Sequence, residues 1–186
     1  GYRHVRGNLL QGLPFRDDCF DLVHQRLMIS GIPLGEWPRV VAELARVTRP
    51  GGWVELVEPM VKPERLGPTT QRLGDLLLRQ VAALGLDTAD TVFGSLDRYL
   101  REAGLEMVRR EEVSLPIGEW GGRVGSFMLS DIRAVCTRLC EGLRSRRAIS
   151  AEEAADLIRG STREFEEYRT TWTVAIALGR KPSRSP

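Results

Sequence analysis

The chain has 186 residues, enough for one domain with a sizeable core, and its 42% hydrophobic and 28% charged residues are ordinary for a globular protein. Its 27 basic and 25 acidic residues leave a net charge of only +2, which argues against nucleic acid and membrane surfaces as partners. Three cysteines without paired spacing and the lack of a secretory signal predict a reduced, cytoplasmic setting.

Two of the cysteines, Cys136 and Cys140, lie four residues apart, which places them on one face of a helix. The chain has only two histidines, His4 and His24, and both are far from these cysteines in sequence. We therefore expect no metal site and interpret both thiols as small buried groups. The longest apolar run near the C-terminus, residues 174–178, is too short to span a bilayer.

The first part of the chain is expected to contain two strands. Residues 2–6 alternate as a short strand does, and the pair that follows them, Gly7-Asn8, breaks this pattern. After a turn-rich connection, residues 20–24 form a compact apolar run that suits a parallel sheet covered on both faces. Ligands of such sheets bind beyond the carboxyl ends of the strands. This rule makes candidate site residues of His24, Gln25 and Arg26.

An amphipathic helix is expected to lead to the next strand. Apolar residues recur at offsets of three and four across residues 36–48, which is the pattern of a helix packed on a sheet. Gly51 and Gly52 then allow a left-handed turn, and residues 53–58 form a strand that ends at Glu58. Strand, helix and strand together predict a right-handed parallel unit.

The rest of the chain is predicted to contain four helices and two strands. The strands cover residues 105–115 and 171–180. Between them, the insertion 116–170 is either a lid over a site or a small helical subdomain with its own core. Ser150 and Glu153 have the spacing of a capping box at the start of its second helix. The four helices cover residues 69–84, 90–103, 126–143 and 151–168.

Several short motifs follow one another in an order that resembles class I S-adenosylmethionine-dependent methyltransferases. The resemblance covers residues 2–113 and extends to residues 171–180. It implies an α/β fold with a Rossmann-like methyltransferase sheet, mostly parallel with an antiparallel last strand, plus a helical insertion before that strand. The motifs are Gly7-Asn8, Leu13-Pro14-Phe15, Phe20-Asp21-Leu22-Val23 and Pro50-Gly51-Gly52.

The resemblance also assigns the parts of the chain. No G-x-G-x-x-G motif follows a strand, so the sequence looks like the C-terminal two thirds of a domain whose glycine-rich cofactor loop lies upstream. A chain that started here would expose the edge of its first strand, which either a second copy in a homodimer or the missing part would cover. The assigned parts are residues 1–115 for the partial core, 116–170 for the insertion, 171–180 for the closing strand and 181–186 for a disordered tail.

The cofactor implied by the resemblance is S-adenosylmethionine. The amide of Asn8 would face the adenine amino group, with backbone groups of Leu9 and Leu10 beside the ring. The alternative is that Asn8 is only a turn residue that tolerates unusual dihedral angles. The residues implied to bind the cofactor are Gly7, Asn8, Leu9, Leu10, His24 and Gln25.

His24 and Glu58 are the candidate catalytic residues. An imidazole near neutral pH can take a proton from a hydroxyl or an amine, whereas the alternative is a histidine that only closes the strand end by hydrogen bonding. Glu58 either orients the substrate or accepts a proton, and Glu55, within the strand, is interpreted as a structural partner for an arginine. The candidate substrate-binding residues, suited to an apolar organic acceptor, are Arg26, Trp120, Phe127 and Met128.

The sequence therefore predicts a methyltransferase that acts on a small, partly apolar organic acceptor. Its cofactor already carries an activated methyl group, so the protein has to align the reactants, exclude water and remove a proton. Two alternatives stay open. One is a degenerate or truncated methyltransferase-fold module without catalysis that acts through protein partners. The other is a different Rossmann-like enzyme, against which the order of the motifs argues.

Overall fold

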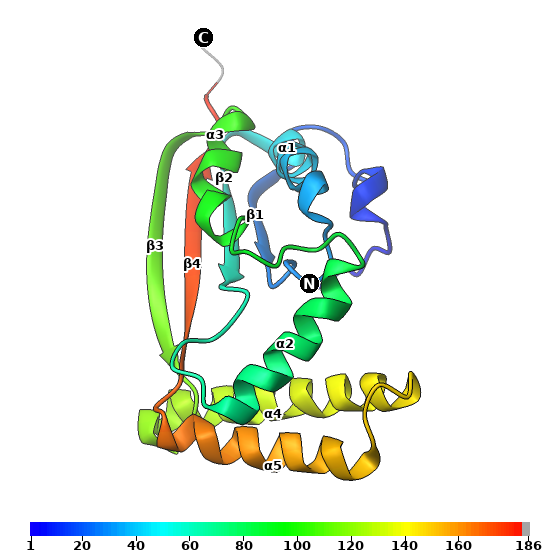
Figure 1. Ribbon diagram of the computed structural model, residues 1–186. Coiled ribbons are helices and arrows are strands. Elements are labelled where there is room, and N and C mark those ends of the chain that lie inside the picture. Colours follow the sequence, from blue (N-terminus) through cyan, green and yellow to red (C-terminus); the bar gives the residue numbers. More distant parts are fainter. Residues whose placement is uncertain (184–186) are drawn as a thin grey trace. The chain divides into compact units, whose positions relative to one another are not determined.

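The computed structural model describes residues 1–183, which form two compact units that are treated separately below (Figure 1). The first unit holds Gly1–Val61, Leu84–Glu112 and the chain from Ala175 on. The second holds Lys62–Ala83 and Val113–Val174, so residues 62–83 join the predicted insertion. The boundaries given to the parts of the chain from its sequence stay a prediction.

The strands of the described residues form one four-stranded sheet in the order β1-β2-β4-β3. Strands β1 and β2 are parallel, and in Figure 1 the arrow of β4 points opposite to those of its neighbours β2 and β3. This arrangement confirms the predicted sheet with an antiparallel last strand. The strands are β1 (Phe20–Arg26), β2 (Thr48–Pro59), β3 (Glu106–Pro116) and β4 (Thr171–Arg180).

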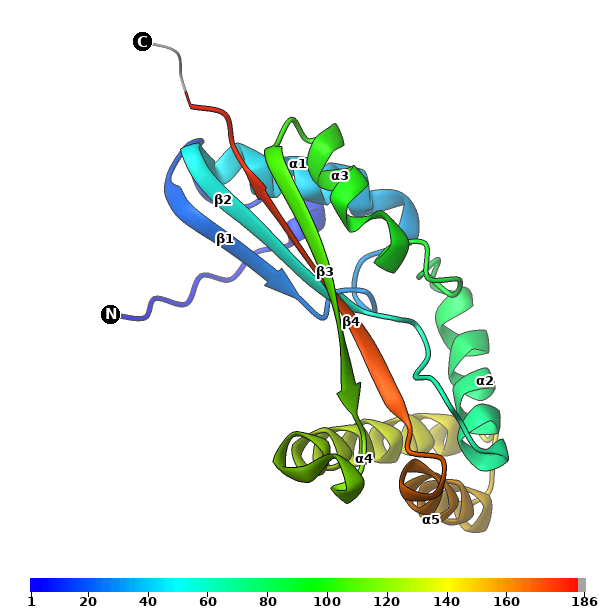
Figure 2. The same ribbon diagram turned by 90° about the vertical axis from the view of Figure 1, so that its left-hand side faces the viewer.

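Helix α1 (Trp37–Val47) joins β1 to β2, as predicted. The first turn of α1 contains a proline. The backbone N–H group that proline lacks would have no acceptor within the helix at this position, so the proline is tolerated there. Figure 2 shows α1 and α3 (Leu96–Glu102) behind the sheet, whose other face is turned to the viewer. The core of the first unit therefore lies between the sheet and these two helices. Its buried side chains include Trp37, Val40, Val41, Leu44, Val54, Leu56, Leu96 and Leu100.

Strand β2 begins at Thr48, before the Pro-Gly-Gly motif, which corrects the start predicted at residue 53. Gly51 has the expected left-handed backbone, with a φ of 78°, but it lies inside the strand. The pairing of β1 with β2 is irregular beside it, and a bulge accommodates a left-handed glycine without ending a strand. A Cβ atom on Gly52 would lie 2.8 Å from the carbonyl oxygen of Asp21, so only glycine fits there.

Two other assignments in the first unit need correction. Residues 2–6 form no strand and Tyr2 is 93% exposed, since an alternating sequence becomes a strand only where a neighbouring strand supplies backbone partners. The helix predicted from residue 90 starts late, because η3 (Phe93–Ser95) precedes α3. There Asp87 accepts the backbone N–H of Val92 at 2.6 Å, which stabilises a turn instead of the helix.

Lys181 stands at the start of the predicted disordered tail but is held in place. Its ammonium group donates to the carboxylate of Asp18 and to the carbonyl oxygen of Thr48, both at 2.8 Å. These bonds join the end of β4 to the segment before β1 and to the beginning of β2. The last part of that tail, residues 184–186, lies outside the described residues.

The second unit contains three α-helices that match predicted ones and share an apolar core of their own. The hydroxyl of Ser150 accepts the backbone N–H of Glu153 at 3.0 Å, as a cap does. Cys136 and Cys140 are buried in this core, and burial raises the pKa of the Cys136 thiol to about 11. They therefore act as small apolar groups. The helices are α2 (Pro68–Ala82), α4 (Gly122–Ser145) and α5 (Ala151–Glu167).

Glu164 of α5 caps the first turn of α2. Its carboxylate accepts the backbone N–H groups of Thr69 at 2.9 Å and Thr70 at 2.7 Å, and the Thr70 hydroxyl at 2.8 Å. Burial would raise the pKa of Glu164, but these hydrogen bonds outweigh it and the pKa is lowered. A carboxylate is favoured there because the helix dipole is positive at the N-terminus.

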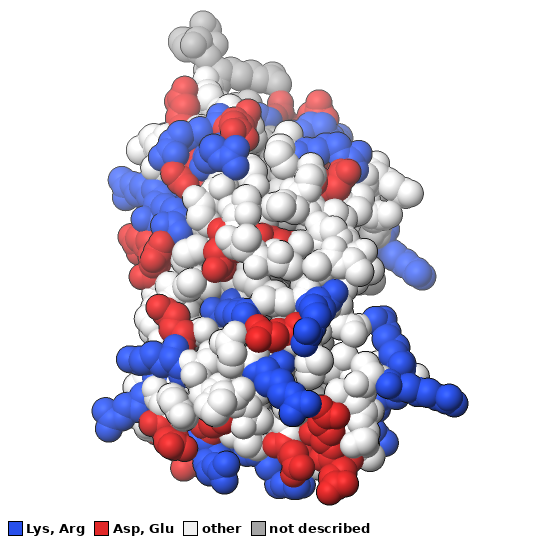
Figure 3. Space-filling view, viewed as in Figure 1, with Lys and Arg blue, Asp and Glu red and all other residues white. Residues whose placement is uncertain are grey.

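Positive and negative side chains are interspersed over the surface seen in Figure 3, in line with the net charge of +2. Within residues 1–183 there is no helix with both the length and the apolar character that a bilayer crossing requires.

Candidate cofactor and active site

The candidate site lies at the carboxyl ends of β1 and β2 in the first unit. These parallel strands place His24 opposite Glu55 and Gln25 opposite Leu56. Because successive side chains of a strand point to opposite faces, His24 and Gln25 belong to different faces of the sheet. Glu58 is at the end of β2. The predicted residues of the two strands are thus at the same edge, where ligands of open α/β sheets bind.

The side chain of Gln25 is buried without a partner. Gln25 is 7% exposed, and within residues 1–183 neither its amide oxygen nor its amide nitrogen has a hydrogen-bond partner. It shares its face with Val23, which packs against the core of the first unit. Leaving a buried polar group such as an amide unpaired costs about 1–3 kcal/mol. An amide at this edge that lacks partners of its own is suited to bind a ligand.

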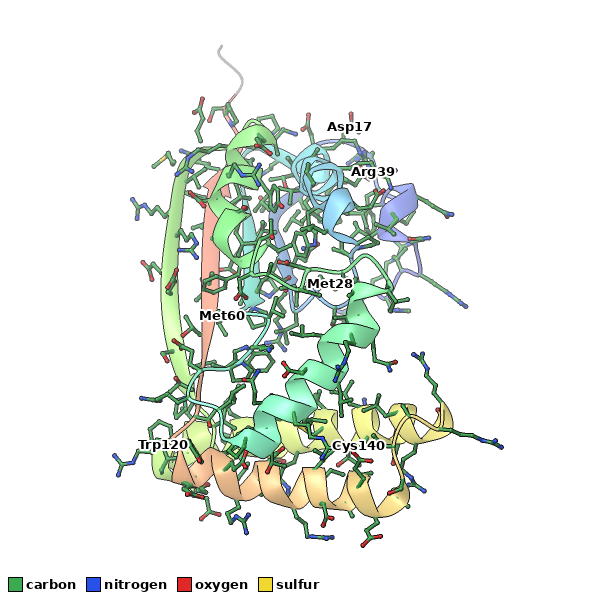
Figure 4. All side chains as sticks on the ribbon, viewed as in Figure 1. Asp17, Met28, Arg39, Met60, Trp120 and Cys140 are labelled. Carbon is green, nitrogen blue, oxygen red and sulfur yellow. The ribbon has the colours of Figure 1, made fainter. Side chains whose placement is uncertain are left out.

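Glu58 is fully buried and holds the segment that follows β1. Its two carboxylate oxygens accept the backbone N–H groups of Met28 at 2.9 Å and Ile29 at 3.0 Å. Leu27, which precedes them, has a φ of 56° and donates its N–H to the carbonyl oxygen of Val57 at 3.0 Å. The chain thus turns directly beyond β1, and Met28, labelled in Figure 4, packs against the core of the first unit. Burial raises the pKa of Glu58 to about 7, against the two hydrogen bonds, which lower it.

This pKa predicts how stability depends on pH. Because the pKa of Glu58 is higher in the folded than in the unfolded chain, Glu58 contributes stability that is complete below about pH 4.5 and is lost as the pH rises through about 7. The loss is roughly 3 kcal/mol, since one pKa unit corresponds to about 1.4 kcal/mol. We expect the difference in unfolding free energy between the native chain and Glu58→Gln to shrink by that amount over this range.

Chemical denaturation at a series of pH values measures this difference. Glu111→Gln, a change of the same kind at an exposed position, serves as the control and should give a difference that does not vary with pH. A constant difference for Glu58→Gln would contradict the prediction.

His24 is paired with Glu55. Its Nδ1 atom lies 2.5 Å from Oε2 of Glu55, and the side chains are 43% and 33% exposed. The partner of Glu55 is thus a histidine, which corrects the arginine expected from the sequence. A histidine oriented by a carboxylate and open to solvent is chemically suited to exchange protons.

The residues expected around the adenine ring lie in and beside η1 (Leu9–Gln11). The Asn8 side-chain oxygen accepts the N–H of Leu10 at 3.0 Å, which fits a turn residue and leaves one lone pair for another donor. Leu9 and Leu10 pack against the core of the first unit, while Gly7 is exposed. Arg26, at the end of β1, is also exposed.

The other candidate residues belong to the second unit. Trp120 donates its indole N–H to the carbonyl oxygen of Ile117 at 3.0 Å, and the Arg65 guanidinium lies over its ring. Phe127 is 65% exposed, and Met128 packs against the core of this unit. Their contacts are those of a helical unit with its own core, and their role toward a substrate stays a prediction.

Sequence reasoning missed the pairing of His24 with Glu55. Two strands in a right-handed parallel unit do predict neighbours, but their register depends on the irregular pairing beside Gly51. A shift of one residue would move Glu55 to the other face of the sheet. The pairing follows from the structure alone.

Comparison with known proteins finds similarity to methyltransferases. A family model described as a methyltransferase domain matches residues 2–56. N-methyltransferase sirN of Leptosphaeria maculans is 30% identical over 175 residues, which cover 89% of this chain and 61% of that protein. N-methyltransferase verN of Clonostachys rogersoniana is 32% identical over 191 residues, covering 96% and 62%. The chain thus spans about three fifths of the length of these relatives.

Solved structures agree on the fold. A complex of Haemonchus contortus phosphoethanolamine N-methyltransferase 2 with S-adenosyl-L-methionine has a TM-score of 0.50 at 14% identity, covering 95% of this chain and 36% of that one. A SAM-dependent methyltransferase from Archaeoglobus fulgidus has a TM-score of 0.50 at 9% identity, covering 95% and 66%. The motifs, the strand order and these relatives coincide, and the chain is similar in sequence and in fold to S-adenosylmethionine-dependent methyltransferases.

Proposed function

We propose that this chain takes part in methyl transfer from S-adenosylmethionine to a nitrogen atom of a small, partly apolar organic acceptor. The observation that carries the proposal is the buried amide of Gln25, which has no partner within residues 1–183 and lies at the edge where parallel sheets bind ligands. The choice of nitrogen as the accepting atom rests on the two relatives described above, sirN and verN, which are both named N-methyltransferases.

The residues at this edge fit the cofactor. An amide can donate and accept at once, so Gln25 can pair with a polar group of the cofactor, and the free lone pair of Asn8 can accept from its adenine amino group. Leu9 and Leu10 supply an apolar surface beside Asn8. When bound, the cofactor supplies a methyl group that is already activated on a sulfonium.

The remaining tasks fall to side chains of this chain. Glu58 holds Met28 and Ile29 in a fixed turn beyond β1, which keeps the edge of the site in one shape. Both of its oxygens are engaged, so we assign it this supporting role in place of proton transfer. His24 is the residue that takes a proton from the acceptor, because its imidazole is 43% exposed.

A small acceptor is favoured over a macromolecule. The net charge of +2 is small, and the face seen in Figure 3 carries mixed charges without the basic stripe that nucleic acids require. Three free cysteines, Cys19, Cys136 and Cys140, support a reduced, cytoplasmic setting. Two copies of the chain are also proposed to pair in a homodimer.

The test is transfer of a labelled methyl group. The chain is incubated with methyl-labelled S-adenosylmethionine and a panel of small amines, phenols and carboxylic acids, and the products are separated by mass spectrometry. We expect label on nitrogen in the partly apolar amines. Label on oxygen would overturn the choice of nitrogen, and the absence of both label transfer and S-adenosylhomocysteine binding would overturn the function.

A further inference from the structure

The contact between His24 and Glu55 is built into the sheet. The two residues are opposite each other in the register of β1 and β2, so their side chains come into contact without any distortion of the strands. The Nδ1 atom lies 2.5 Å from Oε2. For comparison, Asp21 and Arg49 form an ion pair between the same strands with side chains that are 79% and 58% exposed. The His24 pair is the more sheltered of the two.

The chemistry of the pair fixes one proton. An ionised carboxylate can only accept hydrogen bonds, so the atom facing it, Nδ1 of His24, has to carry a hydrogen. In a neutral imidazole the other nitrogen, Nε2, then holds the free lone pair. Glu55 thereby selects the tautomer in which Nε2 is the proton acceptor.

The residues beside the pair on this face of the sheet are partly apolar and partly charged, since Arg26 is on the same face of β1 and the Arg180 guanidinium lies over the ring of Trp53. Leu22, which shares the face of His24 on β1, is 56% exposed, and Trp53 and Val57 on β2 are half-buried. Figure 2 shows this face of the sheet turned away from α1 and α3.

We propose that Glu55 is a positioning residue that holds His24 with Nε2 ready to take the proton released by the acceptor nitrogen. This inference rests on the proposed function. As the acceptor nitrogen forms its bond to the methyl group, the bond between this methyl group and the cofactor sulfur breaks, which releases S-adenosylhomocysteine. The N–H bond of the acceptor also breaks, and the proton binds to Nε2 and produces an imidazolium, whose charge Glu55 balances. The imidazole then releases the proton, and Glu55 itself takes up none.

The first arm of the test reads the tautomer without any reaction. Long-range ¹H–¹⁵N correlation spectra in mildly alkaline buffer distinguish hydrogen on Nδ1 from hydrogen on Nε2. The chain has only two histidines, and His4, which is exposed, provides the reference in the same sample. We expect hydrogen on Nδ1 of His24 in the native chain and in the control Asp21→Ala. In Glu55→Ala the spectrum of His24 should become like that of His4.

The second arm measures methyl transfer by the same three proteins. Glu55→Ala should transfer methyl groups at least about tenfold more slowly at saturating substrate, because a positioned base contributes about a hundredfold or more. Asp21→Ala should match the native rate. A purely structural pair would change the melting temperature of Glu55→Ala and leave the rate per folded molecule unchanged.

The outcomes separate the inference from the proposed function. Hydrogen on Nε2 of His24 in the native chain, or an unchanged rate in Glu55→Ala, would overturn the role of Glu55 while methyl transfer itself stood. A native chain that shows the expected tautomer but neither transfers methyl groups nor binds S-adenosylhomocysteine would overturn the proposed function, and the role of Glu55 with it.

Discussion

Glu164→Ala is expected to destabilise the second unit by about 2–4 kcal/mol. The substitution leaves the backbone N–H groups of Thr69 and Thr70 without their acceptor and removes a negative charge from the positive end of α2. The effect should be largest near neutral pH and smaller in acid. Because the pKa of Glu164 is lowered by folding, its contribution is complete above the unfolded pKa and is lost as the pH falls through the folded one. Denaturation curves measure this effect.

The control for this substitution is Glu167→Ala, an exposed carboxylate at the end of the same helix, which should change stability by less than about 0.5 kcal/mol. A sharper test uses Gly67, where a Cβ atom would lie 2.5 Å from Cδ of Glu164. Gly67 has a φ of −77°, which alanine tolerates. The clash of the new Cβ atom with the Glu164 side chain is therefore the main cost of Gly67→Ala. Gly67→Ala should therefore destabilise the native chain but have little effect on Glu164→Ala. If the stability losses of Gly67→Ala and Glu164→Ala were additive in the double variant, the capping role of Glu164 would be contradicted.

Gln25→Leu is expected to stabilise the ligand-free chain and weaken cofactor binding at the same time. Leucine has a similar size and removes two buried polar atoms that have no partner within residues 1–183, which we expect to raise the unfolding free energy by about 1–3 kcal/mol. The same change removes the ligand contact, so affinity for S-adenosylhomocysteine should fall about tenfold or more. Calorimetric titration and thermal unfolding give the two quantities.

The opposite signs of the two effects make this prediction specific to a binding role. Gln71→Leu, at an exposed position of α2, is the matched control and should change neither quantity appreciably. A loss of stability in Gln25→Leu with unchanged affinity would mean that the amide serves the fold and not a ligand.

Much of the fold could be predicted because its patterns are local. The apolar run of β1, the amphipathic period of α1 and the capping serine of α5 each lie within one segment. Residues 2–6 were assigned wrongly because strand formation depends on a neighbour, which no local pattern shows. The early start of β2 was missed because a left-handed glycine suits a turn and a bulge equally well.

The candidate site was predictable only in part. The rule for strand ends gave His24, Gln25 and Glu58, since it needs no more than the boundaries of the strands. The face of each side chain and its partner depend on register and packing, so the burial of Gln25 and the contact with Glu55 were not foreseen. The cap by Glu164 joins residues 95 positions apart in sequence, a distance over which sequence patterns carry no such information.

The central claim is that the edge formed by β1, β2 and the turn at Met28 binds the cofactor, and nuclear magnetic resonance tests it most directly. An isotope-labelled chain is titrated with S-adenosylhomocysteine while the side-chain amide of Gln25 and the backbone amides of Met28 and Ile29 are followed. We predict that these resonances shift together and saturate. Unchanged resonances there, or shifts confined to α2, α4 and α5, would contradict the claim.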